Sequence, residues 1–333
     1  MHPREAWILF PGALGDTVCL EPAVAHLAGR NFSVVVFARG AGAEVAELFP
    51  SRPRVSSIDA AWMARLFAPL GAGQKLDVPE EMRAPKLILS FTGAGHAAVE
   101  ARLAVVGARA FVFPGRMASN VGHAADFFLR AAVEVAASPA LGRLLPAMPR
   151  LQLGEAVPPP TTRGALAPSP AVPRLQLEEV VQPQAGLLVL HPGSGGAAKR
   201  APDSLWRGLI ERWRGEVAGA AVEILLGPAE EGEGGEFWAG IGLQVVRPRD
   251  VRALAWRVAR AEVFIGNDAG PSHVAAGLGV STIVLFGSTD PRTFGPRGKV
   301  GTVTEMHRDP AGALASASAL ALTAHRGALN DAT

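Results

Sequence analysis

The sequence predicts an α/β protein of two domains, each built around a parallel β-sheet. Short, unbroken apolar runs of strand length alternate along the chain with stretches in which apolar residues recur at helical spacing. Strands that alternate with helices form βαβ units, and strands of a parallel sheet are apolar throughout because both of their faces are buried. The chain has 333 residues, about the length of two average domains.

Eight apolar runs are the predicted strands, four on each side of the chain's midpoint. In order, they are Trp7–Phe10, Ser33–Phe37, Leu87–Phe91, Ala110–Phe113, Leu187–Leu190, Val222–Leu226, Glu262–Ile265 and Thr282–Phe286. Helical spacing is clearest over Thr17–Gly29 and Leu205–Ala218, and each of these stretches lies between two predicted strands.

A proline-rich stretch that includes Pro158-Pro159-Pro160 interrupts this alternation. Proline recurrence of this kind is typical of interdomain connections. We therefore predict an N-terminal domain over 1–150, a linker over 151–185 and a C-terminal domain over 186–333. Two such domains would leave a cleft between them, and ligands of parallel sheets bind beyond the carboxyl ends of the strands.

The composition excludes several classes of protein. Charged residues make up 19% of the chain and the net charge is +2, which argues against a nucleic-acid-coating protein. Cys19 is the single cysteine, so there is neither an intrachain disulfide nor a cysteine-based zinc site. The apolar run Ala6–Phe10 is too short for a signal peptide, and no apolar stretch approaches the length of a membrane span. We expect a cytoplasmic protein.

The first polar junction, "ILFPGALGDTVCLEPAV", runs from Ile8 to Val24. Gly12 and Gly15 permit a tight turn after the strand, and Asp16 stands where a helix begins. Asp16 is either the N-cap of that helix or a general base within reach of a substrate hydroxyl. The glycines do not form the G-x-G-x-x-G fingerprint, which disfavours a dinucleotide-dependent dehydrogenase.

The second junction, "LLVLHPGSGGAAKRAPDSLW", runs from Leu187 to Trp206. Its glycines, Gly195 among them, expose backbone N–H groups that can surround an anion, while Ser194 adds a hydroxyl and Lys199 a mobile positive charge. The Walker pattern G-x-x-x-x-G-K-[ST] is absent. The competing interpretation is a flexible turn with a surface lysine.

Two further junctions carry acids and hydroxyls. In "EILLGPAEEGE", Glu230 or Glu231 could accept hydrogen bonds from sugar hydroxyls, although a solvated acidic loop explains the same residues. In "FGSTDP", Ser288, Thr289 and Asp290 could contact a ligand, and an Asx-type turn before Pro291 is the alternative.

The most polar junction is "NDAGPSH", at 267–273, between a predicted strand and a predicted helix. Pro271 suits the first helical position, so the N–H groups of Ser272 and His273 would point free from a positive helix end that can bind phosphate. Gly270 would let a ligand approach the backbone, and Asp268 could bind a hydroxyl or orient His273. Gly-Pro also starts many helices that bind nothing.

Together these motifs resemble the heptosyltransferase family, glycosyltransferase family 9. The resemblance is carried by "GALGD" in the first junction, "HPGSG" followed by "AK" in the second, and "NDAGPSHVAAGLGVSTIVLFGSTDP" over 267–291. It implies a GT-B fold, in which two Rossmann-like domains face each other across a cleft. It also implies inverting transfer of heptose from ADP-heptose to a lipopolysaccharide-core acceptor, with no cofactor and no obligatory metal.

The resemblance implies a role for each matching residue. Asp16 resembles the base that deprotonates the acceptor hydroxyl. The positions that resemble substrate-binding residues are Gly15, Ser194, Gly195, Lys199, Glu230, Asp268, Ala269, Gly270, Pro271, His273 and Thr289. Ala269 stands where the family often has a hydroxyl residue. A lipid-linked acceptor implies transient contact with the inner-membrane surface, which the 15 basic and 12 acidic residues of the first 150 permit.

Two other functions remain open on the sequence alone. The chain could be a GT-B enzyme that uses another nucleotide-sugar, or a nucleotide-sugar-binding protein without turnover. Asp16 argues against the second, because nucleotide binding alone needs no base on the other domain.

Overall fold

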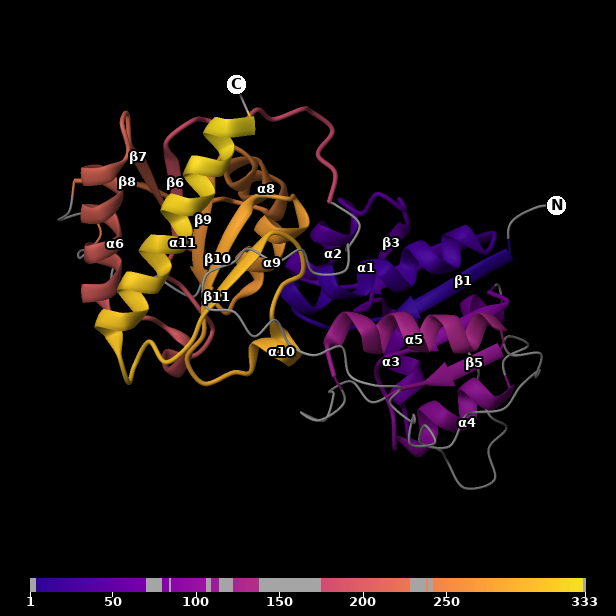
Figure 1. The fold of residues 1–333 in the computed structure, drawn as a ribbon. Coiled ribbons are helices and arrows are strands. Elements are labelled where there is room, and N and C mark those ends of the chain that lie inside the picture. Colours follow the sequence, from indigo (N-terminus) through magenta and orange to yellow (C-terminus); the bar gives the residue numbers. More distant parts are fainter. Residues whose placement is uncertain are drawn as a thin grey trace. The chain divides into compact units, whose positions relative to one another are not determined.

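The computed structural model of the chain describes residues 4–69, 80–83, 85–105, 109–113, 122–137, 175–227, 238 and 242–331 (Figure 1). Contacts between residues divide the chain into two compact units, 1–157 and 158–333. Residues 151–174 of the predicted linker lie outside the described residues. The remainder of that linker is bound to the second unit, because the backbone N–H of Leu175 donates to the carbonyl oxygen of Gly277 at 2.8 Å.

The N-terminal unit contains a five-stranded parallel sheet with the order β3-β2-β1-β4-β5. Its elements are β1 (Arg4–Leu9), α1 (Leu14–Gly29), β2 (Phe32–Ala38), α2 (Gly40–Ala46), β3 (Arg54–Ser57), α3 (Ala61–Phe67), the 3-10 helix η1 (Glu80–Arg83), β4 (Leu87–Ser90), α4 (Ala97–Val105), β5 (Arg109–Val112) and α5 (Ala124–Ala137).

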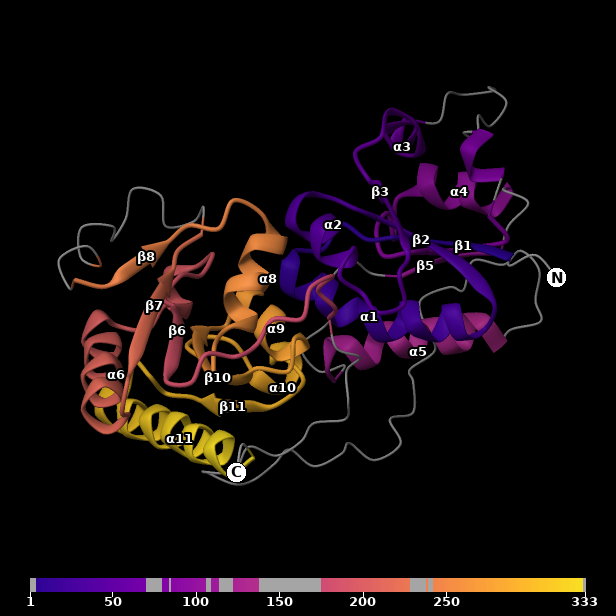
Figure 2. The same ribbon diagram turned by 90° about the horizontal axis from the view of Figure 1, so that it is seen from above.

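Helices cover both faces of this sheet. Figure 2 shows α3 and α4 together on one face, and α1 with α5 on the other. On the α3 and α4 face, Met63 and Leu66 pack with Val99 and Leu103 over apolar side chains of the central strands. Removal of this apolar surface from water, at about 25 cal/mol for each Å² buried, is what holds the helices on the sheet.

The C-terminal unit contains a six-stranded parallel sheet with the order β11-β10-β9-β6-β7-β8. Its elements are β6 (Leu187–His191), the 3-10 helix η2 (Ala197–Lys199), α6 (Asp203–Glu216), β7 (Ala221–Leu225), β8 (Gln244–Val246), α8 (Val251–Ala259), β9 (Val263–Asn267), α9 (Gly270–Gly277), β10 (Ser281–Leu285), α10 (Pro291–Phe294), β11 (Val300–Val303) and α11 (Pro310–Asp331).

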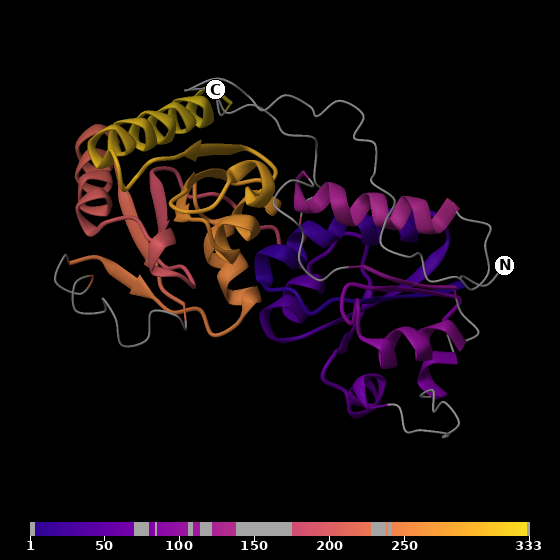
Figure 3. The same cartoon turned by 90° about the horizontal axis from the view of Figure 1, so that it is seen from below.

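Helices α6 and α11 lie side by side over one face of the second sheet, as Figures 1 and 3 show. Trp206 and Trp213 of α6 are fully buried in the apolar cluster beneath them. Each indole N–H has a partner: Trp206 donates to the carbonyl of Ala201 at 3.2 Å and Trp213 to that of Gly186 at 3.0 Å. These bonds let two polar N–H groups enter the core without a desolvation penalty.

All eight predicted strands are present, and the described residues contain three further strands that were not predicted, namely β3, β8 and β11. With the first strand of each unit numbered 1, the sheet orders are 3-2-1-4-5 and 3-2-1-4-5-6, which is the doubly wound Rossmann topology. The predicted α/β class with two Rossmann-like parallel sheets is therefore confirmed. Across the described ranges, no helix combines the length and the apolar character that a bilayer span requires.

Candidate functional site

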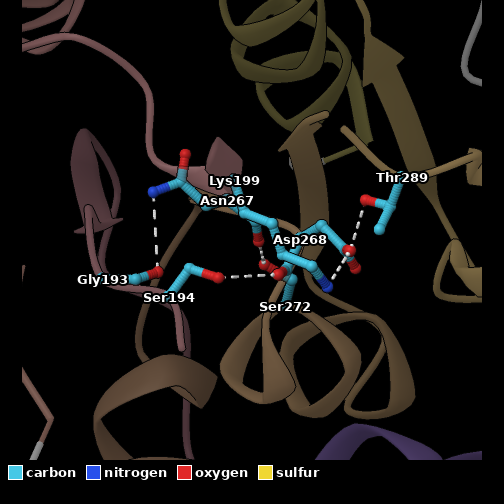
Figure 4. A network of polar contacts seen from close by, with 7 residues as sticks. All are labelled: Gly193, Ser194, Lys199, Asn267, Asp268, Ser272 and Thr289. Atoms are coloured by element: carbon cyan, nitrogen blue, oxygen red, sulfur yellow. Dashed lines mark hydrogen bonds and ion pairs between the residues drawn. The ribbon is translucent and has the colours of Figure 1, made fainter. Parts of the chain in front are cut away.

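The candidate site lies where the strand order of the second sheet reverses. Strand β6 is followed in the chain by β7 on one side, while its other neighbour, β9, comes later. The loops that leave β6 and β9 at their carboxyl ends diverge at such a reversal, and doubly wound sheets bind their ligands there. The loop after β6 carries Ser194 and Lys199, and the loop after β9 carries Asp268 (Figure 4).

Asp268 brings together residues from three strand ends. Its carboxylate oxygen Oδ2 accepts a hydrogen bond from Lys199 Nζ at 2.7 Å and another from Thr289 Oγ1 at 2.6 Å. The Asp268 side chain is 5% exposed, whereas that of Lys199 is 34% exposed. The ion pair therefore holds the ammonium group in a defined place while leaving part of it open to solvent, where an anion can reach it.

Ser194 and Gly195 contribute differently from each other. Ser194 is buried, and its hydroxyl donates to the backbone carbonyl of Asp268 at 3.2 Å, so it must rotate away from that carbonyl to donate to a ligand. Gly195 has no left-handed φ, and a Cβ placed on it would meet no atom within 4 Å. Neither backbone conformation nor packing requires glycine at 195, and its backbone is open to a ligand.

The start of α9 is an uncapped helix N-terminus. Ala269 is the N-cap residue and makes no side-chain capping bond, while Gly270 and Pro271 occupy the first two helical positions. A helix start without a side-chain cap favours an anion, because backbone N–H groups and the positive end of the helix dipole point out of it. Two predictions need correction: Pro271 is second rather than first, and the N–H of Ser272 is not free because it donates to the Ala269 carbonyl at 3.1 Å. His273 is buried in the same turn.

His191 is the last residue of β6, immediately before the loop that carries Ser194 and Lys199. It contributes no positive charge at neutral pH. The ring is 5% exposed, its Nδ1 has no hydrogen-bond partner of normal geometry, and burial lowers its pKa to about 4. Lys199 therefore carries the charge of the site rather than this histidine.

Two acids of the predicted site do not join this network. Glu230, together with Glu231, lies outside the described residues, so its role stays a prediction. Asp290 is the N-cap of α10, where its Oδ1 accepts from the backbone N–H of Arg292 at 2.9 Å. Hydrogen bonds from the Arg292 side chain lower the pKa of this carboxyl. For Asp290 the Asx-type turn, the alternative interpretation, is correct.

Asp16 lies at the equivalent place in the first unit, because it follows β1, the strand at which that sheet reverses its order. The N-cap of α1 is Ala13, and Asp16 is the third residue of the helix and is exposed. The interpretation of Asp16 as the N-cap is therefore wrong, and Gly15 is the second helical residue rather than part of the preceding turn. The position in this turn that requires glycine is Gly12, because a Cβ there would come within 2.6 Å of the Phe10 ring atom Cζ.

Asn267 is a residue of the site to which the sequence assigned no role. Its side chain is fully buried and bonds to the backbone at Pro192 and Ala201, both in the loop after β6. Its place in the sequence, between a buried strand and Asp268, was the available signal. Among the described residues, no group of three or more His, Cys, Asp or Glu side chains could hold a metal ion.

Comparison with known proteins relates this arrangement to one family. The profile of glycosyltransferase family 9 (heptosyltransferase) matches residues 155–320. The lipopolysaccharide heptosyltransferase 1 of Pseudomonas aeruginosa is 36% identical over 115 residues, a stretch that covers 34% of this chain and 32% of that protein. The match to this curated relative thus spans about a third of its length.

Solved structures with the same fold cover nearly the whole chain. The ADP-heptose lipopolysaccharide heptosyltransferase II of E. coli has a TM-score of 0.64 at 15% identity, covering 96% of this chain and 99% of that one. The E. coli heptosyltransferase WaaC, solved with ADP, has a TM-score of 0.61 at 16% identity, with 96% and 98% coverage. At this level of identity the likeness concerns the fold. Residues 155–320 thus belong to glycosyltransferase family 9, the heptosyltransferases.

Proposed function

We propose that this chain is an inverting glycosyltransferase that moves heptose from ADP-heptose onto a hydroxyl of a lipopolysaccharide-core acceptor. The match of residues 155–320 to glycosyltransferase family 9 supports the reaction class, and the curated relative is named a lipopolysaccharide heptosyltransferase. The observation that carries the proposal is the Lys199 ammonium held beside the uncapped start of α9 at the reversal point of the second sheet.

This arrangement suits departure of a nucleoside diphosphate. As the bond between the sugar and the β-phosphate breaks, negative charge grows on the phosphate oxygens. The ammonium of Lys199 and the backbone N–H groups near Ala269 and Gly195 are fixed before the reaction, so they stabilise that charge without reorganising. Asp268 keeps the lysine in place, and Thr289 helps to orient the Asp268 carboxylate.

Asp16 is the proposed general base. A carboxylate that accepts the proton of the attacking hydroxyl typically contributes a rate factor of about 10² to 10⁴. The hydroxyl oxygen then attacks the anomeric carbon from the face opposite the leaving diphosphate, which inverts the configuration there. The proposal assigns donor binding to the C-terminal unit and acceptor binding to the N-terminal unit, where Gly15 lies beside Asp16 in the first turn of α1.

The acceptor implies where the protein works. A lipid-linked core oligosaccharide is made at the inner membrane, so we propose a cytoplasmic protein that contacts that surface transiently. The excess of basic residues in the first 150 suits an anionic surface.

Titration calorimetry with ADP, UDP, GDP and CMP, each with and without EDTA, tests the donor assignment. We expect the chain to prefer ADP and to keep its affinity in EDTA. Preference for UDP or GDP would exclude ADP-heptose as the donor, and loss of binding in EDTA would contradict metal independence. Absence of binding to every nucleotide would overturn the proposed diphosphate site.

A further inference from the structure

We propose that Asn267 is a positioning residue that fixes the loop over 192–201, and with it the Lys199 ammonium, at the donor site. This inference rests on the proposed function for its ligand, and on the hydrogen bonds of the Asn267 side chain for its geometry. Asn267 is the last residue of β9, and its side chain crosses to the loop that leaves the neighbouring strand β6 (Figure 4).

The amide of Asn267 holds both ends of that loop. Its Nδ2 donates to the Pro192 carbonyl at 2.6 Å, with a longer contact of 3.5 Å to that of Gly193, and its Oδ1 accepts from the N–H of Ala201 at 3.0 Å. The partners themselves fix the orientation of the amide, because a carbonyl can only accept and an N–H can only donate. One side chain thus closes a segment ten residues long.

Between these two ends the loop is braced by its own bonds. Arg200 Nε donates to the Ser194 carbonyl at 3.0 Å, and the backbone N–H of Lys199 donates to the Gly196 carbonyl at 3.0 Å. The loop should therefore shift as one piece when an end is released. Lys199 lies two residues from the Ala201 end, so its backbone position depends directly on the bond to Asn267 Oδ1.

Asn267 is itself fixed. Its side chain has 0% relative exposure, and its backbone carbonyl accepts from Ser272 Oγ, in the first turn of α9, at 2.7 Å. Because Asn267 is fully buried, water cannot readily take the place of a lost backbone partner. Release of the loop would therefore leave a buried amide group unpaired, at the cost of its desolvation. Asn267 therefore fixes the position of the loop over 192–201 relative to the start of α9. The proposed diphosphate site requires both of these parts.

The Asn267→Asp variant tests this role with little change in shape. The carboxylate can still accept from Ala201, but its other oxygen faces the carbonyl oxygen of Pro192, so that end of the loop is released. We expect ADP affinity to fall about tenfold or more, as it should for Lys199→Met, which removes the charged donor. Asn267→Ala, which removes both bonds without adding a charge, is the second variant in case Asn267→Asp does not fold.

Thr282→Val is the matched control. Thr282 is also fully buried in this sheet, and its hydroxyl donates to the Val280 carbonyl at 2.9 Å near the start of β10, the end of the sheet away from the site. The Thr282→Val variant loses a buried hydrogen bond from a side chain to a backbone carbonyl, as the Asn267 variants do. It should therefore reduce the stability of the protein without changing its affinity for ADP.

A double-mutant cycle separates positioning of Lys199 from general destabilisation. If Asn267 acts through Lys199, then Asn267→Asp combined with Lys199→Met should bind ADP within about threefold of Lys199→Met alone. Independent effects would instead multiply, and that result would overturn the inference, as would an Asn267→Asp protein with unchanged ADP affinity.

Amide hydrogen exchange gives a readout that does not depend on ADP. Asn267→Asp should speed exchange in the peptide that spans 192–201, and Thr282→Val should not. If the wild-type chain binds no ADP yet this difference appears, then the proposed function fails while the positioning role stands. Unchanged exchange in the loop of Asn267→Asp would overturn the positioning role itself.

Discussion

Burial changes the pKa of two side chains in opposite directions, because it disfavours the charged form of each. Glu21 in α1 is fully buried, neither carboxyl oxygen makes a hydrogen bond of normal geometry, and burial raises its pKa to about 7 despite the partly opposing influence of the Ser51 hydroxyl. His191 has its pKa lowered to about 4. Glu21 thus destabilises the folded chain when deprotonated, and His191 does so when protonated.

Replacement of Glu21 by Met should stabilise the protein at alkaline pH. The folded-state pKa of Glu21 is raised from 4.5 to about 7, so its contribution to stability is fully present below pH 4.5 and is lost as the pH rises to 7. This difference corresponds to about 3 kcal/mol at most. Urea unfolding at several pH values should show a variant that is more stable than the wild type at pH 8.

The advantage of Glu21→Met should shrink steadily as the pH falls from 7 to 4.5. His191 titrates in both proteins, so the difference between them isolates Glu21. An advantage of the same size at every pH would mean that Glu21 has an ordinary pKa in the folded chain.

The strands that the sequence predicted and those that it missed differ in their place in the sheets. The missed strands β3, β8 and β11 all lie at sheet edges. Their side chains are partly exposed: in β3 none is buried, and in β11 buried and open positions alternate. An edge strand has a neighbour on one side only, so it needs no continuous apolar run, which is the signal of a central parallel strand.

The same contrast applies to the site. Parallel strands end at one edge of their sheet, so the sequence was sufficient to group Lys199, Asp268 and Thr289 near one another. It was not sufficient to identify Asn267, whose partners Pro192 and Ala201 lie 75 and 66 residues away and are backbone groups. Backbone hydrogen bonds leave no residue-type pattern at the partner positions.

Gly287, which follows β10, is required for the position of the short helix η2. A Cβ on Gly287 would collide with the Ala198 carbonyl oxygen and come within 2.9 Å of Met306 Cε. We expect Gly287→Ala to displace η2, lower the free energy of unfolding by about 1–3 kcal/mol and weaken ADP binding, because Lys199 is part of η2. Urea unfolding and calorimetry measure the two effects.

Gly195→Ala is the control for this change. Because a Cβ at 195 meets nothing within 4 Å, its stability should match that of the wild type. A Gly287→Ala protein with the stability and ADP affinity of the wild type would contradict this account of the packing around η2. So would a Gly195→Ala protein that is destabilised as much as Gly287→Ala.

At the scale of the whole molecule, the two units share one topology but differ in chemistry. Each sheet reverses its order at its first strand, and each places polar residues after that strand. In the first unit the reversal point carries the exposed acid Asp16, whereas in the second it carries Lys199 and an uncapped helix start. Because one fold hosts many activities, the function has to be argued from these groups rather than from the topology.

The most direct test of the central claim is ADP release from ADP-heptose in the presence of a lipopolysaccharide-core acceptor, measured for the wild type and for Asp16→Asn in parallel. We predict that the wild type turns over and that Asp16→Asn is slower by a factor of about 10² or more, with its affinity for ADP unchanged. A wild-type chain that binds ADP but releases none from ADP-heptose, or an Asp16→Asn protein as fast as the wild type, would contradict the account.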